Sequence, residues 1–105
     1  MQEITVQELK QLVDNGTDFQ LIDVREEWEY ENANLKGEHI ALATIIDNAD
    51  KISRNKQVVI HCRSGARSGQ AVQLLEKNLG FTNLYNLKGG ILAWKNEIDH
   101  SLDVS

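Results

Sequence analysis

The chain contains one cysteine, Cys62, and the residues that follow it are polar rather than apolar. A lone cysteine is most often a small buried apolar group. A reactive thiol instead lies beside cations and backbone amides. The next six residues favour the reactive thiol, since they form a charged loop that contains glycine: Arg63, Ser64, Gly65, Ala66, Arg67 and Ser68.

This loop joins an apolar, β-branched strand over 58–60 to a helix expected over about 67–78. The first amides of a helix have no partner within it, and with the helix dipole they form a site for an anion. We therefore predict that Cys62 is held as a thiolate, with a pKa below that of a free cysteine. Gly65 allows the backbone to curl around the sulfur.

The side chains of the loop add donors around the thiol. Ser64 and Ser68 carry hydroxyl groups, and the guanidinium groups of Arg63 and Arg67 suit anionic oxygens. We expect a small anionic sulfur donor such as thiosulfate to bind here.

The length of the loop separates two kinds of cysteine chemistry. Cysteine phosphatases use a Cys-x5-Arg loop that surrounds a phosphate, whereas this chain has Cys62-x4-Arg67. The shorter loop leaves less room for a tetrahedral phosphate but accommodates one extra sulfur atom. It therefore favours sulfur transfer over a phosphatase or arsenate reductase activity.

The rest of the sequence predicts the elements that hold this loop. Strands alternate with helices, which indicates an α/β layer sandwich around a mostly parallel sheet, with ligands beyond the carboxyl ends of the strands. A capping box at Thr5–Glu8 begins the first helix. The stretch 32–42 leaves room for a short strand. The other expected elements are strands over 19–23, 58–60 and 83–87, and helices over 26–31, 45–52, 67–78 and 91–97.

Size and composition narrow the class of protein. The 105 residues suffice for one domain, expected over 1–105, and the net charge of −5 argues against sequence-independent nucleic-acid binding. With one cysteine there is no internal disulfide, and neither a signal peptide nor an apolar membrane span is evident. We expect a cytoplasmic monomer, although a domain cut from a longer protein would look the same.

Three segments resemble the signatures of the rhodanese family, in the family's order and over nearly the whole chain: Leu21–Glu26, His61–Ser68 and Leu87–Trp94. The resemblance implies a rhodanese-like three-layer sandwich, with a mostly parallel five-stranded sheet flanked by helices on both faces. It also implies that residues 1–105 are a single rhodanese domain without a cofactor or metal.

The resemblance further implies a two-step, ping-pong sulfur transfer. The Cys62 thiolate takes the outer sulfur of a donor such as thiosulfate, and an acceptor then removes it from the Cys62 persulfide. Asp23 and Arg25 are expected to order the wall of the site. His61 precedes Cys62 on a strand and is expected to be a packed residue rather than a base.

The two tryptophans and the other two histidines are not expected to take part in the chemistry. Trp28 and Trp94 are expected in the core or the wall of a pocket. His39 and His100 belong to no recognisable cluster.

One stretch departs from the common family pattern. Many rhodaneses have Gly-His-Ile-Pro-Gly-Ala after the first signature, but here Asn34 stands in place of that histidine. This variant, with the tail 96–102, is similar to the rhodanese domain at the C-terminus of ubiquitin-activating-like enzymes that sulfurate carrier proteins. A protein sulfur acceptor is therefore an alternative, and a non-catalytic docking domain is disfavoured by the presence of Cys62.

Overall fold

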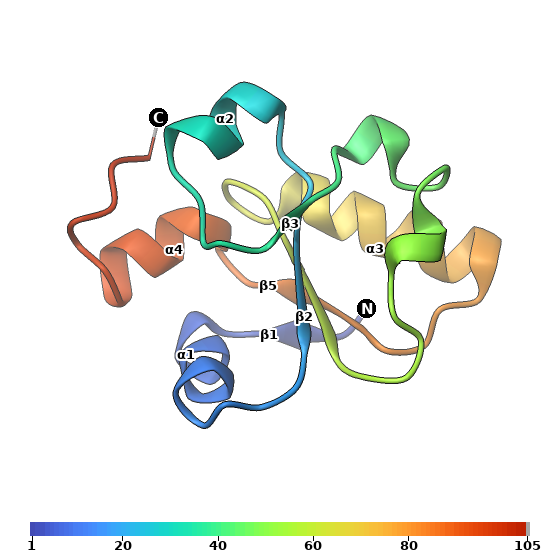
Figure 1. The fold of residues 1–105 in the computed structure, drawn as a ribbon, viewed down its shortest axis with the longest axis horizontal. Coiled ribbons are helices and arrows are strands. Elements are labelled where there is room, and N and C mark those ends of the chain that lie inside the picture. The colour runs from blue at the N-terminus through green and yellow to red at the C-terminus, as the bar shows by residue number, and fades with distance from the viewer. Residues whose placement is uncertain (105) are drawn as a thin grey trace.

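A five-stranded parallel sheet forms the centre of the molecule (Figure 1). The computed structural model describes residues 1–104. The strands lie in the order β1-β5-β4-β2-β3, and every neighbouring pair is parallel. Their bounds are β1 Glu3–Ile4, β2 Gln20–Asp23, β3 Glu38–His39, β4 Val58–His61 and β5 Leu84–Leu87.

The central strand β4 has the sequence that its place requires. All four of its residues are buried, and three of them are β-branched and apolar. A parallel strand covered on both faces needs such a continuous apolar run. The two edge strands, β1 and β3, are only two residues long, which limits pairing with another chain.

Helices cover both faces of the sheet and create two separate cores (Figure 1). Helix α3 (Ala66–Leu79) packs on one face, where the larger core includes Ile60, Val72 and Leu75. On the other face, α1 (Val6–Asp14) and α4 (Gly90–Glu97) contact each other over the smaller core. The predicted three-layer α/β sandwich is confirmed.

The ends of two helices follow the sequence prediction. The side chain of Thr5 accepts a hydrogen bond from the amide of Glu8, and the side chain of Glu8 accepts one from the amide of Thr5. This is the predicted capping box. Helix α3 ends at Gly80 in the left-handed conformation, which glycine adopts without a steric penalty.

The predicted helix over 45–52 is wrong. Residues 45–48 form turns instead, between two short 3₁₀ helices at Leu42–Thr44 and Ala49–Lys51. Asn48 interrupts the segment, since its backbone leaves the α-helical region and its side-chain amide donates to the carbonyl of Thr44. Asparagine competes with helical hydrogen bonds in this way. Ile45 is nevertheless buried, as its apolar character requires.

Helix α2 (Glu27–Asn32) turns a carboxylate inward and an indole outward. Glu29 is buried, whereas Trp28 is 61% exposed. The expectation that Trp28 lies in the core or a pocket wall is therefore wrong, because a helix of six residues has only one inward face and Glu29 occupies it. Trp94 does pack against the smaller core.

No helix among residues 1–104 combines the length and apolarity needed to cross a lipid bilayer.

Candidate active site

Buried polar residues gather around the carboxyl ends of β2, β4 and β5. Polar groups are buried at a cost unless they are paired, so such a cluster marks a place with a specific purpose. Of the seven residues concerned, only Gln20 lies at the other end of the sheet; the cluster comprises Asp23, Arg25, Glu29, His61, Ser68 and Asn86.

Cys62 lies at the centre of this cluster, in the turn between β4 and α3. Its sulfur accepts a hydrogen bond from the amide of Gly65 at 3.1 Å and lies 3.3 Å from the hydroxyl of Ser68. Gly65 begins α3 with a φ of 111°, a backbone conformation that favours glycine. The loop thus turns the start of the helix toward the thiol, as the sequence predicts.

These contacts favour the thiolate. Burial alone would raise the pKa of Cys62, but the hydroxyl of Ser68 and the amides of Ser68, Gly65 and Ser64 outweigh it and lower the pKa. Cys62 exposes only 1% of its surface. The sulfur is therefore almost fully enclosed, with the amide of Gly65 and the hydroxyl of Ser68 beside it.

Asn86 on β5 holds both Ser68 and the loop in place. Its side-chain oxygen lies 2.5 Å from the hydroxyl of Ser68, and its amide nitrogen donates to the carbonyl of Gly65 at 3.1 Å. A hydroxyl has one proton, so Ser68 donates either to Asn86 or to the sulfur of Cys62. The position of this proton is thus coupled to the charge on the sulfur. Asn86 was not identified from the sequence, because no local pattern links it to a loop 18 or more residues away.

The start of α4 braces the loop from behind. The amides of Ile91 and Leu92 donate to the carbonyls of Cys62 and Arg63 at 3.0 and 3.1 Å. The approach requires Gly90, since a Cβ atom there would lie 2.5 Å from both carbonyl oxygens. With the carbonyls held by α4, the loop amides are left to face the sulfur. The segment Leu87–Trp94 was noted from the sequence only for its family resemblance. In the structure it contains the amides that hold the carbonyls of the loop.

Arg67 does not stand open for an anion in this structure. Its guanidinium forms a two-point ion pair with the carboxylate of Glu29, at 2.6 and 2.9 Å. The pair lowers the pKa of Glu29 to about 2, chiefly through the hydrogen bond from Arg67. Glu29 is a second residue that the sequence analysis missed, and only its place in a helix rich in acids could have pointed to it.

Asp23 and Arg25, expected to order the wall of the site, form a buried ion pair. The guanidinium of Arg25 donates to both carboxylate oxygens of Asp23 and to the carbonyl of Ala33 at 2.6 Å. Both charged side chains are buried, and neither contacts the sulfur through a hydrogen bond that the structure shows. A buried, fully paired arginine of this kind positions the chain between β2 and β3.

His61 lies on the face of β4 opposite to Cys62. Its neighbours in the strand show the alternation, since Ile60 and Cys62 belong to the larger core and Val59 to the smaller one. The ring is fully buried, 3.7 Å from Asp23, with no hydrogen-bond partner at either ring nitrogen among the described residues. Desolvation lowers its pKa despite the nearby carboxylate. The structure therefore does not place it as a base for Cys62.

The other members of the loop form its outer rim. Arg63, Ser64 and Ala66 are exposed, and Gly65 is partly buried. His39, away from the loop, stacks on Tyr30 and contacts the carbonyl of Arg25. Over residues 1–104, no three or more His, Cys, Asp or Glu side chains lie together as they would around a metal ion.

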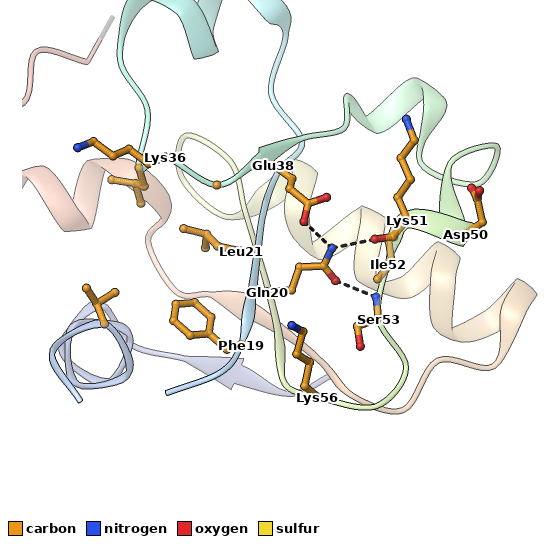
Figure 2. A pocket seen from close by; sticks show the side chains of 13 residues that line it. Phe19, Gln20, Leu21, Lys36, Glu38, Asp50, Lys51, Ile52, Ser53 and Lys56 are labelled. Atoms are coloured by element: carbon orange, nitrogen blue, oxygen red, sulfur yellow. Dashed lines mark hydrogen bonds between the residues drawn. The ribbon is translucent and has the colours of Figure 1, made fainter. Parts of the chain in front are cut away.

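A hollow in the described surface lies at the opposite end of the sheet (Figure 2). It has a volume of about 570 Å³, and Gln20 is one of the residues that line it. The polar atoms of Gln20 are all engaged, with Glu38, the carbonyl of Lys51 and the amide of Ser53. Lys36 and Lys51 extend away from it (Figure 2). The hollow lies away from Cys62, which is not among its lining residues.

Comparison with known proteins agrees with the fold. The rhodanese-like domain model matches residues 5–97. Putative sulfurtransferase YtwF of Bacillus subtilis is 32% identical over 98 residues, which cover 92% of this chain and 93% of YtwF. A rhodanese-like domain protein from Staphylococcus aureus has a solved structure with a TM-score of 0.83, 32% identity, and coverage of 100% of this chain and 99% of that one.

Other relatives are longer than the matched segment. Uncharacterized protein YqhL of Bacillus subtilis is 42% identical over 80 residues, which are 75% of this chain and 63% of YqhL. Probable adenylyltransferase/sulfurtransferase MoeZ of Mycobacterium tuberculosis is 31% identical over 98 residues, covering 90% of this chain but only 25% of MoeZ. With a family model that spans most of the chain, and a relative and a solved structure matched almost from end to end, this chain belongs to the rhodanese-like domain family.

Proposed function

We propose that this chain is a sulfurtransferase that carries one sulfur atom as a persulfide on Cys62. The observation that carries the proposal is the convergence of the Gly65 amide and the Ser68 hydroxyl on a single buried sulfur. Such donors stabilise a negative charge there without reorganisation during the reaction. The names of the relatives YtwF and MoeZ support the same class of reaction.

The first half-reaction loads the sulfur. The Cys62 thiolate attacks the outer sulfur of thiosulfate, a bond forms between the two sulfurs, and the sulfur–sulfur bond of thiosulfate breaks. Sulfite leaves with the electron pair, and Cys62 becomes a persulfide whose terminal sulfur carries the negative charge. The loop amides and the hydroxyl of Ser68, which favour the Cys62 thiolate, support the proposal that the charge is stabilised there.

The second half-reaction unloads it. A thiophilic acceptor, such as cyanide, attacks the terminal sulfur, and the Cys62 thiolate is the leaving group. A lowered pKa makes Cys62 a better leaving group as well as a better-populated nucleophile. The two half-reactions share one enzyme form, so the kinetics are ping-pong.

Intact-mass measurement after incubation with thiosulfate tests the proposal. We expect the chain to gain one sulfur atom, which cyanide or a reductant removes. Cys62→Ser should abolish the gain completely while leaving the unfolding curve close to that of the wild type, because the change is nearly isosteric. A sulfur gain in that variant, or none in the wild type, would contradict the mechanism.

A second candidate is a relay module that passes the Cys62 persulfide to another protein. The match to one quarter of MoeZ favours it, because in that relative the equivalent segment is part of a much longer protein. Comparison of thiosulfate:cyanide turnover with sulfur delivery to the C-terminal glycine of a carrier protein separates the two. Poor turnover with efficient delivery indicates the relay.

We further propose that residues 1–105 act as one cytoplasmic, monomeric domain. The rim of the loop, with Arg63 and Ser64 exposed, is where a small donor or a partner protein would approach. The chain spans 63% of YqhL and a quarter of MoeZ, so the activities and partners of those proteins are hypotheses for this one.

A further inference from the structure

We propose that Asn86 is a positioning residue that acts through Ser68: it holds the Ser68 hydroxyl while the sulfur of Cys62 is uncharged and releases it when the sulfur becomes a thiolate. The inference rests on the proposed sulfurtransferase function and concerns how the same site alternates between its two half-reactions. Its basis is a single buried hydroxyl that lies within reach of two competing acceptors.

The side-chain amide of Asn86 is built into the first turn of α3. Asn86 is 4% exposed and Ser68 is fully buried. The amide oxygen lies 2.5 Å from the hydroxyl, and the amide nitrogen donates to the carbonyl of Gly65 at 3.1 Å. The reverse orientation would set an oxygen against that carbonyl with no proton between them. A Cβ atom on Gly69 would lie only 3.3 Å from the nitrogen, so glycine at this position lets α3 approach closely. The amide oxygen is therefore aimed at Ser68.

The hydroxyl of Ser68 has one proton and several acceptors around it. They are the oxygen of Asn86 at 2.5 Å, the sulfur of Cys62 at 3.3 Å and the carbonyl of Gly65 at 3.3 Å. While the sulfur is neutral, the amide oxygen is the closer and better acceptor. Once the sulfur is a thiolate, the hydrogen bond to the charged atom is the stronger one. Asn86 therefore stabilises the uncharged sulfur, whereas Ser68 stabilises the charged one.

The two half-reactions need these two states in turn. When the Cys62 thiolate attacks thiosulfate, its electron pair forms the new sulfur–sulfur bond, sulfite leaves with the pair of the broken bond, and the charge lies on the terminal sulfur. The hydroxyl of Ser68 then returns to Asn86. When cyanide removes the terminal sulfur as thiocyanate, the electron pair of the sulfur–sulfur bond goes to Cys62, and the hydroxyl turns back to it. Rotation of one buried hydroxyl thus follows the charge without movement of the chain.

A purely structural role for Asn86 makes the opposite prediction. If the amide only held Ser68 toward the sulfur, its loss would leave the hydroxyl misdirected and the thiolate less stable. The proposal instead requires that loss of the competing oxygen make the thiolate more stable. The direction of one shift therefore separates the two roles.

The test is the pH dependence of the alkylation of Cys62 by iodoacetamide, which reacts with the thiolate. Asn86→Leu keeps the branched shape of the side chain and removes both of its polar atoms. We expect the midpoint of the alkylation profile to move to lower pH by up to about one unit, because a neutral hydrogen bond no longer has to be given up when the thiolate forms.

Asn83→Leu is the matched control. Asn83 precedes β5 at the other end of that strand, and its side-chain nitrogen donates to the carbonyls of Ser53 and Lys56, both at 2.7 Å. It thus holds backbone carbonyls, as Asn86 does, but it holds no group that contacts the sulfur. Its replacement should lower the free energy of unfolding and leave the midpoint of alkylation unchanged.

The same substitution in a Ser68→Ala background locates the effect. Without the hydroxyl, Asn86 has nothing to withhold from the sulfur, so Asn86→Leu should no longer move the midpoint. A measurement on the wild type keeps the inference testable even if Asn86→Leu does not fold. The carbon-13 resonance of the Asn86 side-chain carbonyl should change with the same pH midpoint as alkylation, while that of Asn83 stays constant.

Three results would overturn the inference: an unchanged or higher midpoint in Asn86→Leu, an equal shift in Asn83→Leu or in the Ser68→Ala background, or an Asn86 carbonyl resonance that does not respond to the charge on the sulfur. None of these measurements uses a sulfur donor. A wild type that gains no sulfur from thiosulfate would instead overturn the proposed sulfurtransferase function, so the two failures are distinct.

Discussion

Helices α3 and α4 begin in the same way and serve different ends. Each starts after a glycine with positive φ, 111° at Gly65 and 80° at Gly89. Because glycine has no side chain, neither helix has a side-chain hydrogen bond at its N-cap. At α4, the unpaired amides of Ile91 and Leu92 donate to backbone carbonyls of the loop. At α3, the amide of Gly65 just before the helix donates to the sulfur of Cys62, and the amides of Ser64 and Ser68 also favour the thiolate.

The difference shows that a helix start acquires its role from what lies in front of it. Free amides are available at the start of every helix. Opposite a carbonyl they form ordinary structural hydrogen bonds, and opposite a thiol they stabilise an anion. Here the two roles are linked. The amides of α4 bind the carbonyl groups of the loop, and an amide of the same loop, that of Gly65, faces the sulfur.

The largest effect should come from breaking the brace at α4. Gly90→Ala places a Cβ atom 2.5 Å from the carbonyl oxygens of Cys62 and Arg63, on a residue with a φ of 61°. We expect the free energy of unfolding to fall by about 3 kcal/mol, from overpacking and the left-handed backbone together. Sulfur loading should fall with it. Chemical denaturation and intact mass after incubation with thiosulfate measure the two effects.

Gly80→Ala is the control for the backbone conformation alone. Gly80 ends α3 with a φ of 69°, and a Cβ atom there would meet nothing within 4 Å. This variant should lose only about 1 kcal/mol and keep its sulfur loading. Equal losses in the two variants would show that the contact between α4 and the loop has no special part in the site.

An intermediate effect is expected from removing one donor at α3. Ser68→Ala deletes the hydroxyl 3.3 Å from the sulfur, and should raise the pKa of Cys62. Alkylation by iodoacetamide requires the thiolate, so the alkylation rate rises with pH around the pKa of Cys62. In Ser68→Ala the midpoint of this rise should move to higher pH. At neutral pH we expect the alkylation rate to fall about tenfold, which matches the loss of one hydrogen bond to a charged group.

Ser64→Ala controls for this change. The hydroxyl of Ser64 is on an exposed residue, and only its backbone amide favours the thiolate, which alanine retains. The alkylation profile should therefore stay as in the wild type. If the alkylation profile of Ser68→Ala also coincided with that of the wild type, the backbone amides of the loop alone would stabilise the thiolate.

The smallest effect concerns the strand that leads into α3. The pKa of His61 is lowered by burial, so the unfolded chain takes up a proton that the folded chain refuses. The stabilisation from the neutral ring is complete above about pH 6.5 and is gradually lost as the pH falls below that value. Free energies of unfolding between pH 5 and 7.5 should show a flatter slope for His61→Asn. The exposed His100→Asn should keep the slope of the wild type, and an unaltered slope in both would contradict the prediction.

The sequence predicted the parts of the site that lie next to each other along the chain. The strand over 58–60, the loop around Cys62 and the helix after it are all present, and Gly65 turns the chain as expected. Strand β1 was missed because two residues are too few to show an alternation, and it is defined by pairing of Glu3 and Ile4 with β5. The segment 45–52 was mistaken for a helix because Ile45, Ile46, Ala49 and Ile52 would lie on one side of a helix.

What the sequence determined by itself is a polar, glycine-containing turn between a buried strand and a helix, with a thiol at its start. Backbone sterics and helix geometry require this of neighbouring residues, whatever surrounds them. Only the tertiary structure decided which distant groups meet that turn: Glu29 on Arg67, Asn86 on Ser68, and the amides of α4 on the carbonyls of Cys62 and Arg63. These contacts join residues 18 to 38 positions apart, and they form because the parallel sheet brings the carboxyl ends of its strands to one edge.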